Sequence, residues 1–175
     1  MRPLVVALQL ALLAAPPAKR MNDGNRWTTR NLATTSVPSF CYGNNEQNCR
    51  HYGRLYTWAA AQKACQSLGP AWRLPTDQDW RNLARQHGGV SEDSPDRGKA
   101  AYSALLAKPF QALLGGNRAP NGQFGRLNAH GFFWTATEID QSTAWSYNFG
   151  KGGLALHRQA GIGKEDALSV RCIAK

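Results

Sequence analysis

One segment, from Tyr52 to Leu83, constrains the fold of this chain more than any other, because it carries start and stop signals for two helices. Thr57 can cap the first helix, in which Ala61 and Cys65 are spaced to share one face. The glycine–proline pair at 69–70 ends this helix, since neither residue continues a helix readily. We therefore expect an amphipathic core helix directly after Thr57.

The letters WRLPT in the same segment predict a short extended stretch followed by a second helix. Trp72 and Leu74 are expected to be extended core residues. Thr76, with Asp79 three residues later, is close to a capping box, which marks the start of a helix. Two glycines at 88–89 stop it. Both helices are expected to pack in the core.

The amino terminus has the pattern of a secretory signal peptide over residues 1–18. An apolar run from Leu4 to Ala15 is too short to span a bilayer, and small residues follow it. Cleavage is expected after Ala18 or Ala15, and no second apolar segment of the sequence approaches transmembrane length. We therefore expect residues 19–175 to form a single domain that is secreted, periplasmic or at the cell surface.

Four cysteines, an even number in a chain expected to be exported, predict two disulfides. Three pairings are possible. Cys41 and Cys49 can close the loop CYGNNEQNC, whose asparagines and glycine suit a surface turn, and Cys65 with Cys172 would then tie the first helix to the final strand. A four-cysteine zinc site is the rival interpretation, which the absence of a CxxC pair disfavours.

The rest of the sequence predicts an α+β domain, because helical signals come first and short strand-like runs follow. About 155 residues follow the signal, enough for one domain with a proper core. The further expected elements are an amino-terminal strand within Trp27–Val37, a third helix at Ala100–Leu106, and strands at Gly131–Thr137, Thr143–Phe149, Gly153–Arg158 and Leu168–Ile173.

Eight motifs follow one another along the chain: NLATT, CYGNNEQNC, YGRLYTW, CQSLGPAWRLPTDQDW, LLGGNR, FFWTATE, AWSYNF and SVRCI. In this order they resemble the major paralogous domain first described in Fibrobacter. The WRLPT, FWTAT and VRC elements are also similar to the carboxy-terminal domain of bacterial collagen-like adhesins. The resemblance implies a C-type-lectin-like fold, in which two helices flank a small, mostly antiparallel sheet with long irregular loops. It also implies that the chain ends lie close together and that Cys65 pairs with Cys172.

The triplets that bind calcium in C-type lectins have no counterpart here. Where those lectins carry Glu-Pro-Asn or Gln-Pro-Asp and then Trp-Asn-Asp, this chain has APN at 119–121 and WSY at 145–147. Calcium takes about six to eight oxygen ligands, more than these residues supply. Two acidic pairs are expected in solvated loops instead, Glu138 with Asp140 and Glu165 with Asp166. We therefore expect no metal ion and no other cofactor.

Catalysis is not expected from the motifs. The formylglycine-generating enzymes share a lectin-like fold but use reactive cysteines and a GGSW-type signature, whereas LGGN at 114–117 lacks the tryptophan. The four histidines form no metal-spaced pair; they are His51, His87, His130 and His157. No motif places a nucleophile beside a base.

The chain is strongly basic, with a formal net charge of +10, which bears on its possible partners. The arginines are scattered, with no block of like charge of the kind found in nucleic-acid tails, and export argues against a nucleic-acid partner. Two interpretations stay open: the charge serves solubility alone, or it attracts an acidic surface glycan or an acidic protein. No oligomeric state follows from the sequence.

Ligand contacts are expected in the carboxy-terminal third, from 126 to 164, where aromatic and polar residues are mixed. Trp134 and Trp145 are expected in the core, and only one of Tyr147 and Asn148 can share a sheet face with Trp145. The expected ligand-binding residues are Arg126, Asn128, His130, Phe132, Asp140, Gln141, Tyr147, Lys151, His157 and Arg158.

Together these expectations describe a recognition or adhesion module. Lectin-like domains with SVRC-type endings also serve as variable proteins of diversity-generating retroelements, and the segment Gly131–Ile173 lies where a variable region would. The alternative is a structural component of an envelope or fibre that packs against a partner chain. An exposed aromatic patch would favour binding, and burial of every aromatic would favour the structural role.

Overall fold

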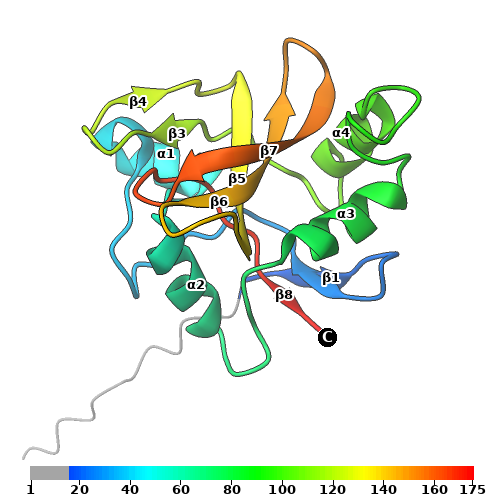
Figure 1. Ribbon diagram of the computed structural model, residues 1–175. Coiled ribbons are helices and arrows are strands. Elements are labelled where there is room, and N and C mark those ends of the chain that lie inside the picture. Colours follow the sequence, from blue (N-terminus) through cyan, green and yellow to red (C-terminus); the bar gives the residue numbers. More distant parts are fainter. Residues whose placement is uncertain (1–15) are drawn as a thin grey trace, which may run out of the picture.

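The computed structural model describes residues 16–175, arranged as Figure 1 shows, so most of the predicted signal peptide lies outside the described residues. The helices are the 3-10 turn η1 (Tyr42–Asn44), α1 (Glu46–Tyr52), α2 (Trp58–Gln66), α3 (Asp77–Arg85) and α4 (Lys99–Leu106). The strands are β1 (Ala18–Arg20), β2 (Arg26–Thr28), β3 (Asn117–Arg118), β4 (Phe124–Gly125), β5 (His130–Glu138), β6 (Thr143–Gly150), β7 (Ala155–Gly163) and β8 (Ile173–Ala174).

These strands form three small antiparallel sheets within residues 16–175, which confirms the α+β class. The largest, β5–β6–β7, lies at the centre of the molecule (Figure 1). The others are β1–β2–β8 and the hairpin β3–β4. None of the described helices has the length and apolar character needed to cross a membrane.

The two ends of the described chain meet in the β1–β2–β8 sheet. Trp27 of β2 pairs with Ile173 of β8, and Lys19 of β1 pairs with Trp27 from the other side. The amino-terminal strands therefore complete the same sheet as the carboxy terminus, as the resemblance implied.

The start signal for α3 is confirmed in atomic detail. Thr76 Oγ1 accepts the Asp79 backbone N–H at 3.1 Å, and an Asp79 carboxylate oxygen accepts the Thr76 backbone N–H at 2.8 Å. This reciprocal pair satisfies two backbone donors that a helix terminus otherwise leaves unpaired. Arg73 fixes the same carboxylate with an ion pair at 2.6 Å, so the WRLPT stretch and α3 are locked together.

The helices α2 and α3 cover opposite faces of the central sheet, as expected. Phe133 and Tyr147 project from one face, where Trp80 of α3 stacks on Tyr147 with ring centroids 5.1 Å apart. Phe132 and Trp134 project from the other face into the cluster that contains Cys65 and other residues of α2. Successive side chains of a strand point to opposite faces, so β5 supplies aromatics to both cores.

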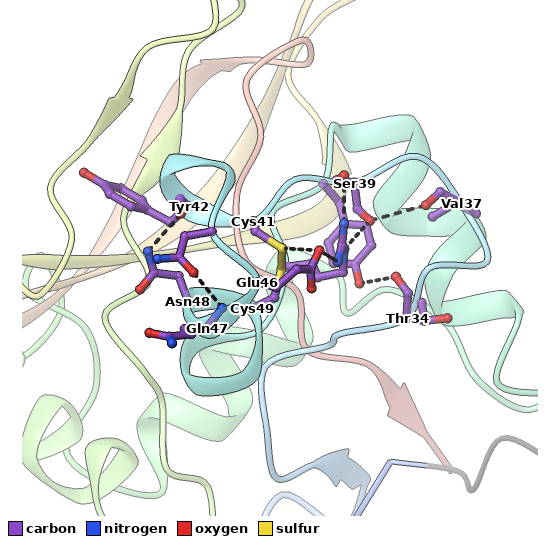
Figure 2. Close-up of a disulfide and its surroundings, with 12 residues drawn as sticks. Thr34, Val37, Ser39, Cys41, Tyr42, Glu46, Gln47, Asn48 and Cys49 are labelled. Carbon is purple, nitrogen blue, oxygen red and sulfur yellow. Dashed lines mark hydrogen bonds and ion pairs between the residues drawn. A yellow bond between two sulfur atoms is a disulfide. The ribbon is translucent and has the colours of Figure 1, made fainter.

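The loop CYGNNEQNC was expected to be a surface turn, which holds only for its first half: residues 43–47 are exposed and η1 is a 3-10 turn, but a helix begins at Glu46. It contains η1 and the first residues of α1, and Figure 2 shows how the two are joined. The Asn45 side-chain oxygen accepts the Gln47 backbone N–H at 2.9 Å and so caps α1. Asparagine serves turns and helix caps by the same hydrogen-bonding chemistry, which is why the sequence did not separate them.

The strand boundaries differ from the expectation near the chain ends and at β7, which was expected over Gly153–Arg158 and extends over Ala155–Gly163. The strand expected within Trp27–Val37 is restricted to Arg26–Thr28, and the last strand begins only at Ile173. Residues 167–169 form isolated bridges instead, with partners as far apart as Tyr56 and Phe133. Such pairings depend on distant segments and leave no periodic pattern in the local sequence.

Both disulfides join the expected cysteines. Cys41 pairs with Cys49 across 8 residues, and Cys65 pairs with Cys172 across 107 residues. Sulfurs joined in this way are not the thiolates that bind zinc, so the rival interpretation is excluded for all four cysteines.

A buried guanidinium connects three distant segments of the chain. Arg171 has no exposed surface, and burial lowers the pKa of its guanidinium to about 9, so the group stays charged at neutral pH. It donates to the backbone oxygens of Thr28 (2.8 Å), Phe110 (2.7 Å) and Gln111 (2.6 Å) and to Asn31 Oδ1 (3.1 Å). Four acceptors in fixed positions match the planar donor fork of arginine.

We predict that Arg171→Met destabilises the fold by about 3 kcal/mol or more, because four buried acceptors lose their donor. The free energy of unfolding, measured in urea by tryptophan fluorescence, checks this. Arg97→Met, at an exposed position, is the control and should stay within about 0.5 kcal/mol of the parent. A small effect at Arg171 would contradict its structural role.

The two disulfides should contribute unequally to stability. Loop-closure entropy predicts about 4.8 kcal/mol for the Cys65–Cys172 bridge and about 2.5 kcal/mol for the Cys41–Cys49 bridge. Replacing each pair by alanines and comparing the urea midpoints tests the difference of roughly 2 kcal/mol. Equal losses would mean that chain entropy does not govern their contributions.

Candidate ligand-binding surface

One face of the central sheet brings together several residues expected from the sequence. In the register of β5, β6 and β7, Asn148 lies opposite both Phe132 and His157, and His130 lies opposite Gly150. Side chains of paired residues in an antiparallel sheet project from the same face. His130, Phe132, Asn148 and His157 therefore share one face, which we call the histidine face.

Direct contacts order the side chains of this face. The His130 ring stacks on Phe132 with centroids 5.4 Å apart and planes 7° apart, and His130 Nδ1 lies 2.9 Å from Asn148 Oδ1. The Arg126 guanidinium lies over the Phe132 ring, 5.6 Å from its centroid. Phe132 is only 3% exposed, so it supports Arg126 and His130 rather than offering a ligand contact of its own.

Gly150 separates the two histidines. A Cβ atom at this position would stand 3.6 Å from His130 Cε1 and 3.9 Å from His157 Cδ2, so the imidazoles flank the glycine. Lys151 follows it in the exposed turn after β6. The histidine face therefore ends in two imidazoles and an ammonium group next to solvent.

Ser91 and His157 have the composition of a catalytic dyad, but a carboxylate competes for the hydroxyl hydrogen of the serine. Ser91 Oγ lies 2.9 Å from His157 Nδ1 and also donates to Glu92 Oε2 at 3.2 Å. A hydroxyl has one hydrogen, so with that hydrogen directed to Glu92 the histidine must donate to the serine. A base that donates to its serine does not activate it as a nucleophile.

A pocket of about 150 Å³ adjoins the histidine face. Arg126 and Asp166 are the charged residues that line this pocket. Neither side chain has a hydrogen-bond or ion-pair partner among the described residues. Burial raises the pKa of the Asp166 carboxyl. The lining residues are Asn117, Arg126, Phe132, Gly161, Ile162, Gly163, Asp166 and Leu168. Asp166 was expected, with Glu165, in a solvated loop, whereas it is half-buried in the structure.

Two further polar groups on the same sheet face lack partners. Ser146 and Gln159 are paired across β6 and β7, two positions along from Asn148 and His157. Ser146 Oγ and Gln159 Oε1 are buried and accept or donate no hydrogen bond among residues 16–175. A buried polar atom without a hydrogen-bond partner lowers the free energy of unfolding. This face therefore has hydrogen-bonding groups that the described residues leave unpaired.

Tyr147 and Arg158, both expected to contact a ligand, project from the opposite face and serve the fold. Tyr147 has no exposed surface, and its hydroxyl donates to Asp77 Oδ1 at 3.1 Å. Arg158 donates to both carboxylate oxygens of Asp77 at 2.7 and 2.9 Å and lies 3.2 Å from the centroid of the Trp145 ring. Burial and the neighbouring Asp77 carboxylate raise the pKa of Tyr147. The split of Tyr147 and Asn148 between faces follows the expected alternation.

Asp140 and Gln141, also expected to bind a ligand, lie at the other end of the sheet, in the β5–β6 turn. The eight-residue rise from His130 to Glu138 places them roughly 25 Å from the histidines. Hydrogen bonds from Thr143 and Ser142 lower the pKa of Asp140 to about 2. Lys164 binds the backbone oxygens of Asp140 and Gln141 and pairs with Glu138 at 2.5 Å. This turn is closed by its own contacts and is separate from the histidine face.

Asn128 is the remaining expected residue, and it links the site to α1. Its Oδ1 accepts the Tyr52 hydroxyl at 2.5 Å, while the residue itself is exposed. Asn128 and Arg126 both have positive φ, 60° and 64°, so this loop has the tight left-handed turns that place Arg126 over the sheet.

Within the described chain, one group of three potential metal ligands is close enough to share an ion: Cys41, Glu46 and Cys49. Its sulfurs form a disulfide, and Glu46 Oε1 lies 3.2 Å from Cys41 Sγ (Figure 2). A disulfide sulfur has no hydrogen to donate and little affinity for a hard cation. Glu46 instead faces Arg54, 3.4 Å away.

No curated protein matches the chain in a sequence comparison. A scan against protein-family models finds one that covers nearly all of the described residues, from 17 to 174: the Fibrobacter succinogenes major domain. The match spans the motif order from NLATT to SVRCI and includes both disulfides. The chain therefore belongs to the Fibrobacter succinogenes major domain family.

Proposed function

We propose that this protein is a secreted or cell-surface recognition module that binds its ligand, without calcium, at the histidine face and the adjoining pocket. The observation that carries the proposal is the pair Arg126 and Asp166, two opposite charges on one pocket wall without partners among the described residues. Charged groups that serve only the fold have partners elsewhere in this molecule: Asp77 pairs with Arg158, and Arg171 donates to backbone oxygens. Unpaired charges next to a pocket are typical of binding sites.

The dimensions of the pocket indicate what it accepts. Sites for whole drug-sized ligands have volumes of roughly 300–1,000 Å³, so a pocket of about 150 Å³ takes one small group of a larger ligand. Asp166 accepts hydrogen bonds from hydroxyl or amino groups, and Arg126 donates to hydroxyl, carboxylate or sulfate groups. A sugar unit of a surface glycan offers both kinds of group, and so does a polar loop of a protein ligand.

The aromatic residues are not the main ligand contacts. Every aromatic side chain of the described chain is buried or half-buried, and the large apolar side chains that are exposed are Ile139 and Leu154. Recognition at the histidine face would therefore depend on hydrogen bonds and charge rather than on aromatic stacking. Salt-sensitive binding of moderate strength is what such a surface supports.

The C-type-lectin-like class is part of this proposal. Its support is the junction of the chain ends at β2 and β8, the helices α2 and α3 on opposite faces of the central sheet, and the Cys65–Cys172 bridge. Service as a variable protein of a retroelement remains a narrower prediction. Much of Gly131–Ile173 is buried, and substitutions at buried positions would destabilise the fold. Sequence variation would therefore be tolerated only at half-buried and exposed positions, for example His157 and Lys151.

A structural role in an envelope or fibre is the alternative, and the burial of the aromatic side chains is the observation that favours it. Catalysis has less support, because the Ser91–His157 contact lacks the hydrogen-bond direction of a nucleophile and its base. The presence or absence of a soluble ligand separates the recognition role from the structural one.

A glycan and surface-protein array should detect a ligand whose binding persists in EDTA. Arg126→Gln and Asp166→Asn should each weaken that binding about tenfold, because each removes one charge-assisted hydrogen bond at the pocket. Arg85→Gln, an exposed arginine outside the pocket, should leave it unchanged. An array without signal would favour the structural alternative, and loss of binding in EDTA would contradict the calcium-independent site.

Asp166→Asn should also stabilise the protein at neutral pH. Burial raises the carboxyl pKa above its ordinary 3.8, so the ionised form is less favourable in the folded than in the unfolded state. This cost is absent well below the ordinary pKa, grows as pH rises, and is complete above the raised pKa. Thermal melts should therefore show a higher midpoint for the variant at about pH 7 and equal midpoints at about pH 3.

Asp140→Asn is the opposite control for this titration. Hydrogen bonds lower the pKa of Asp140 to about 2, so its ionised form stabilises the fold at neutral pH and the variant should melt earlier there. Earlier melting of Asp166→Asn at about pH 7 would mean that the carboxylate has a stabilising partner, against the pocket geometry.

A further inference from the structure

The surface beside the amino-terminal strands contains three adjoining hollows. The first, of about 270 Å³, and the second, of about 500 Å³, share Arg30 and Gln111. The second and the third, of about 450 Å³, share Lys19, Lys108 and Pro109. The shared residues make the three hollows neighbours along one surface, and we call them together the basic groove. None of its lining residues contributes to the pocket beside the histidine face.

The charge of this groove has one sign. Five exposed cationic side chains line it, and none of the described lining residues is acidic. None of the five takes part in an ion pair within the described chain. His51 and His87 lie in the first and third hollows. The cations are Lys19, Arg20, Arg30, Arg50 and Lys108.

The walls of the groove are held in place from beneath. Arg171 donates to Thr28 O on one side and to Phe110 O and Gln111 O on the other. The Asn31 side chain bridges the same walls by donating to Leu113 O at 3.3 Å. A groove fixed by buried hydrogen bonds needs little rearrangement to bind, which lowers the entropic cost of association.

We propose that the basic groove binds a linear acidic polysaccharide, as a second site independent of the proposed recognition site. Repeated carboxylate or sulfate groups match five separated cations, and the amide and hydroxyl side chains of Asn22, Thr29 and Gln111 can meet sugar hydroxyls. Like charges lined along a groove repel one another, and a polyanion removes that repulsion. The formal net charge of +10 thus has a local explanation.

Other anionic partners fit this surface less well. Proteins hold single-stranded nucleic acid by stacking its bases on exposed aromatic side chains. Phe110, the phenylalanine that lines the groove, is only 1% exposed and cannot serve in this way. A membrane surface is met by an exposed apolar stripe flanked by cations, and the exposed large apolar residues Ile139 and Leu154 lie outside the groove.

The test measures binding of the purified chain to a uronate polymer, polygalacturonate, and a sulfated polymer, heparin, with neutral dextran as the blank. The groove variant is Arg30→Gln with Arg50→Gln. Its matched control is Arg85→Gln with Arg97→Gln, which removes the same charge. Arg50 and Arg85 each lie in the last turn of a helix, and Arg30 and Arg97 each lie in a loop. Thermal melts confirm that both variants are folded.

We expect the groove variant to bind the acidic polymers about tenfold more weakly and the control to change less than about twofold. The slope of log affinity against log salt concentration should fall by about two in the groove variant, because it counts the cations in contact with the polymer. Arg126→Gln should leave polymer binding unchanged, so a failure here is distinguishable from a failure of the proposed recognition site.

Three results would overturn the proposal. Equal weakening in the groove variant and the control would mean that net charge alone attracts the polymer. Absence of measurable binding to both polymers at low salt would remove the ligand class. Tighter binding to a single-stranded oligonucleotide or to anionic lipid vesicles than to either polysaccharide would assign the groove to those partners instead.

Discussion

The buried guanidinium of Arg171 is the interaction on which the rest of this structure depends. It joins Thr28 at the end of β2, and Asn31 shortly after it, to the turn at 110–111, from which the chain separates them by about half its length. Ser169, two residues before Arg171, exchanges backbone hydrogen bonds with β5, so the segment that leads into β8 is tied to the central sheet as well. A positive charge buried without an acidic partner is tolerated only where hydrogen-bond acceptors in fixed positions replace the water around it. The segments that supply these acceptors must therefore hold defined positions relative to one another.

The two faces of the central sheet differ in how far their polar groups are paired. On the face covered by α3, Asp77, Tyr147 and Arg158 satisfy one another and Arg158 covers Trp145. The histidine face instead presents polar groups whose hydrogen-bonding capacity is only partly used. Alternation along β6 and β7 assigns each residue to one of these environments, so adjacent residues such as His157 and Arg158 have unrelated roles.

The expected ligand-binding residues come from one segment of the sequence, and the structure divides them between different surfaces. Arg126, His130, Phe132 and His157 come together, whereas Tyr147 and Arg158 had the same composition of aromatic and cationic groups yet face the core. The missing information was strand register, because a shift of one residue exchanges the two faces. The basic groove was invisible for a related reason: its cations come from positions between 19 and 108 and form a stripe only when the amino-terminal strands, α1 and the turn at 110–111 meet.

The sequence by itself determined the elements whose signals are local: the capping box that starts α3, the bounds of α2, the alternating strands β5 and β6, and the cysteines available for two bridges. It also determined, through its motif order, the family to which the chain belongs. Only the tertiary structure decided which polar residues share a face, which charges are paired, and where the surplus cations gather. Local signals act through neighbouring backbone groups, whereas burial and charge pairing depend on contacts between residues far apart in the chain.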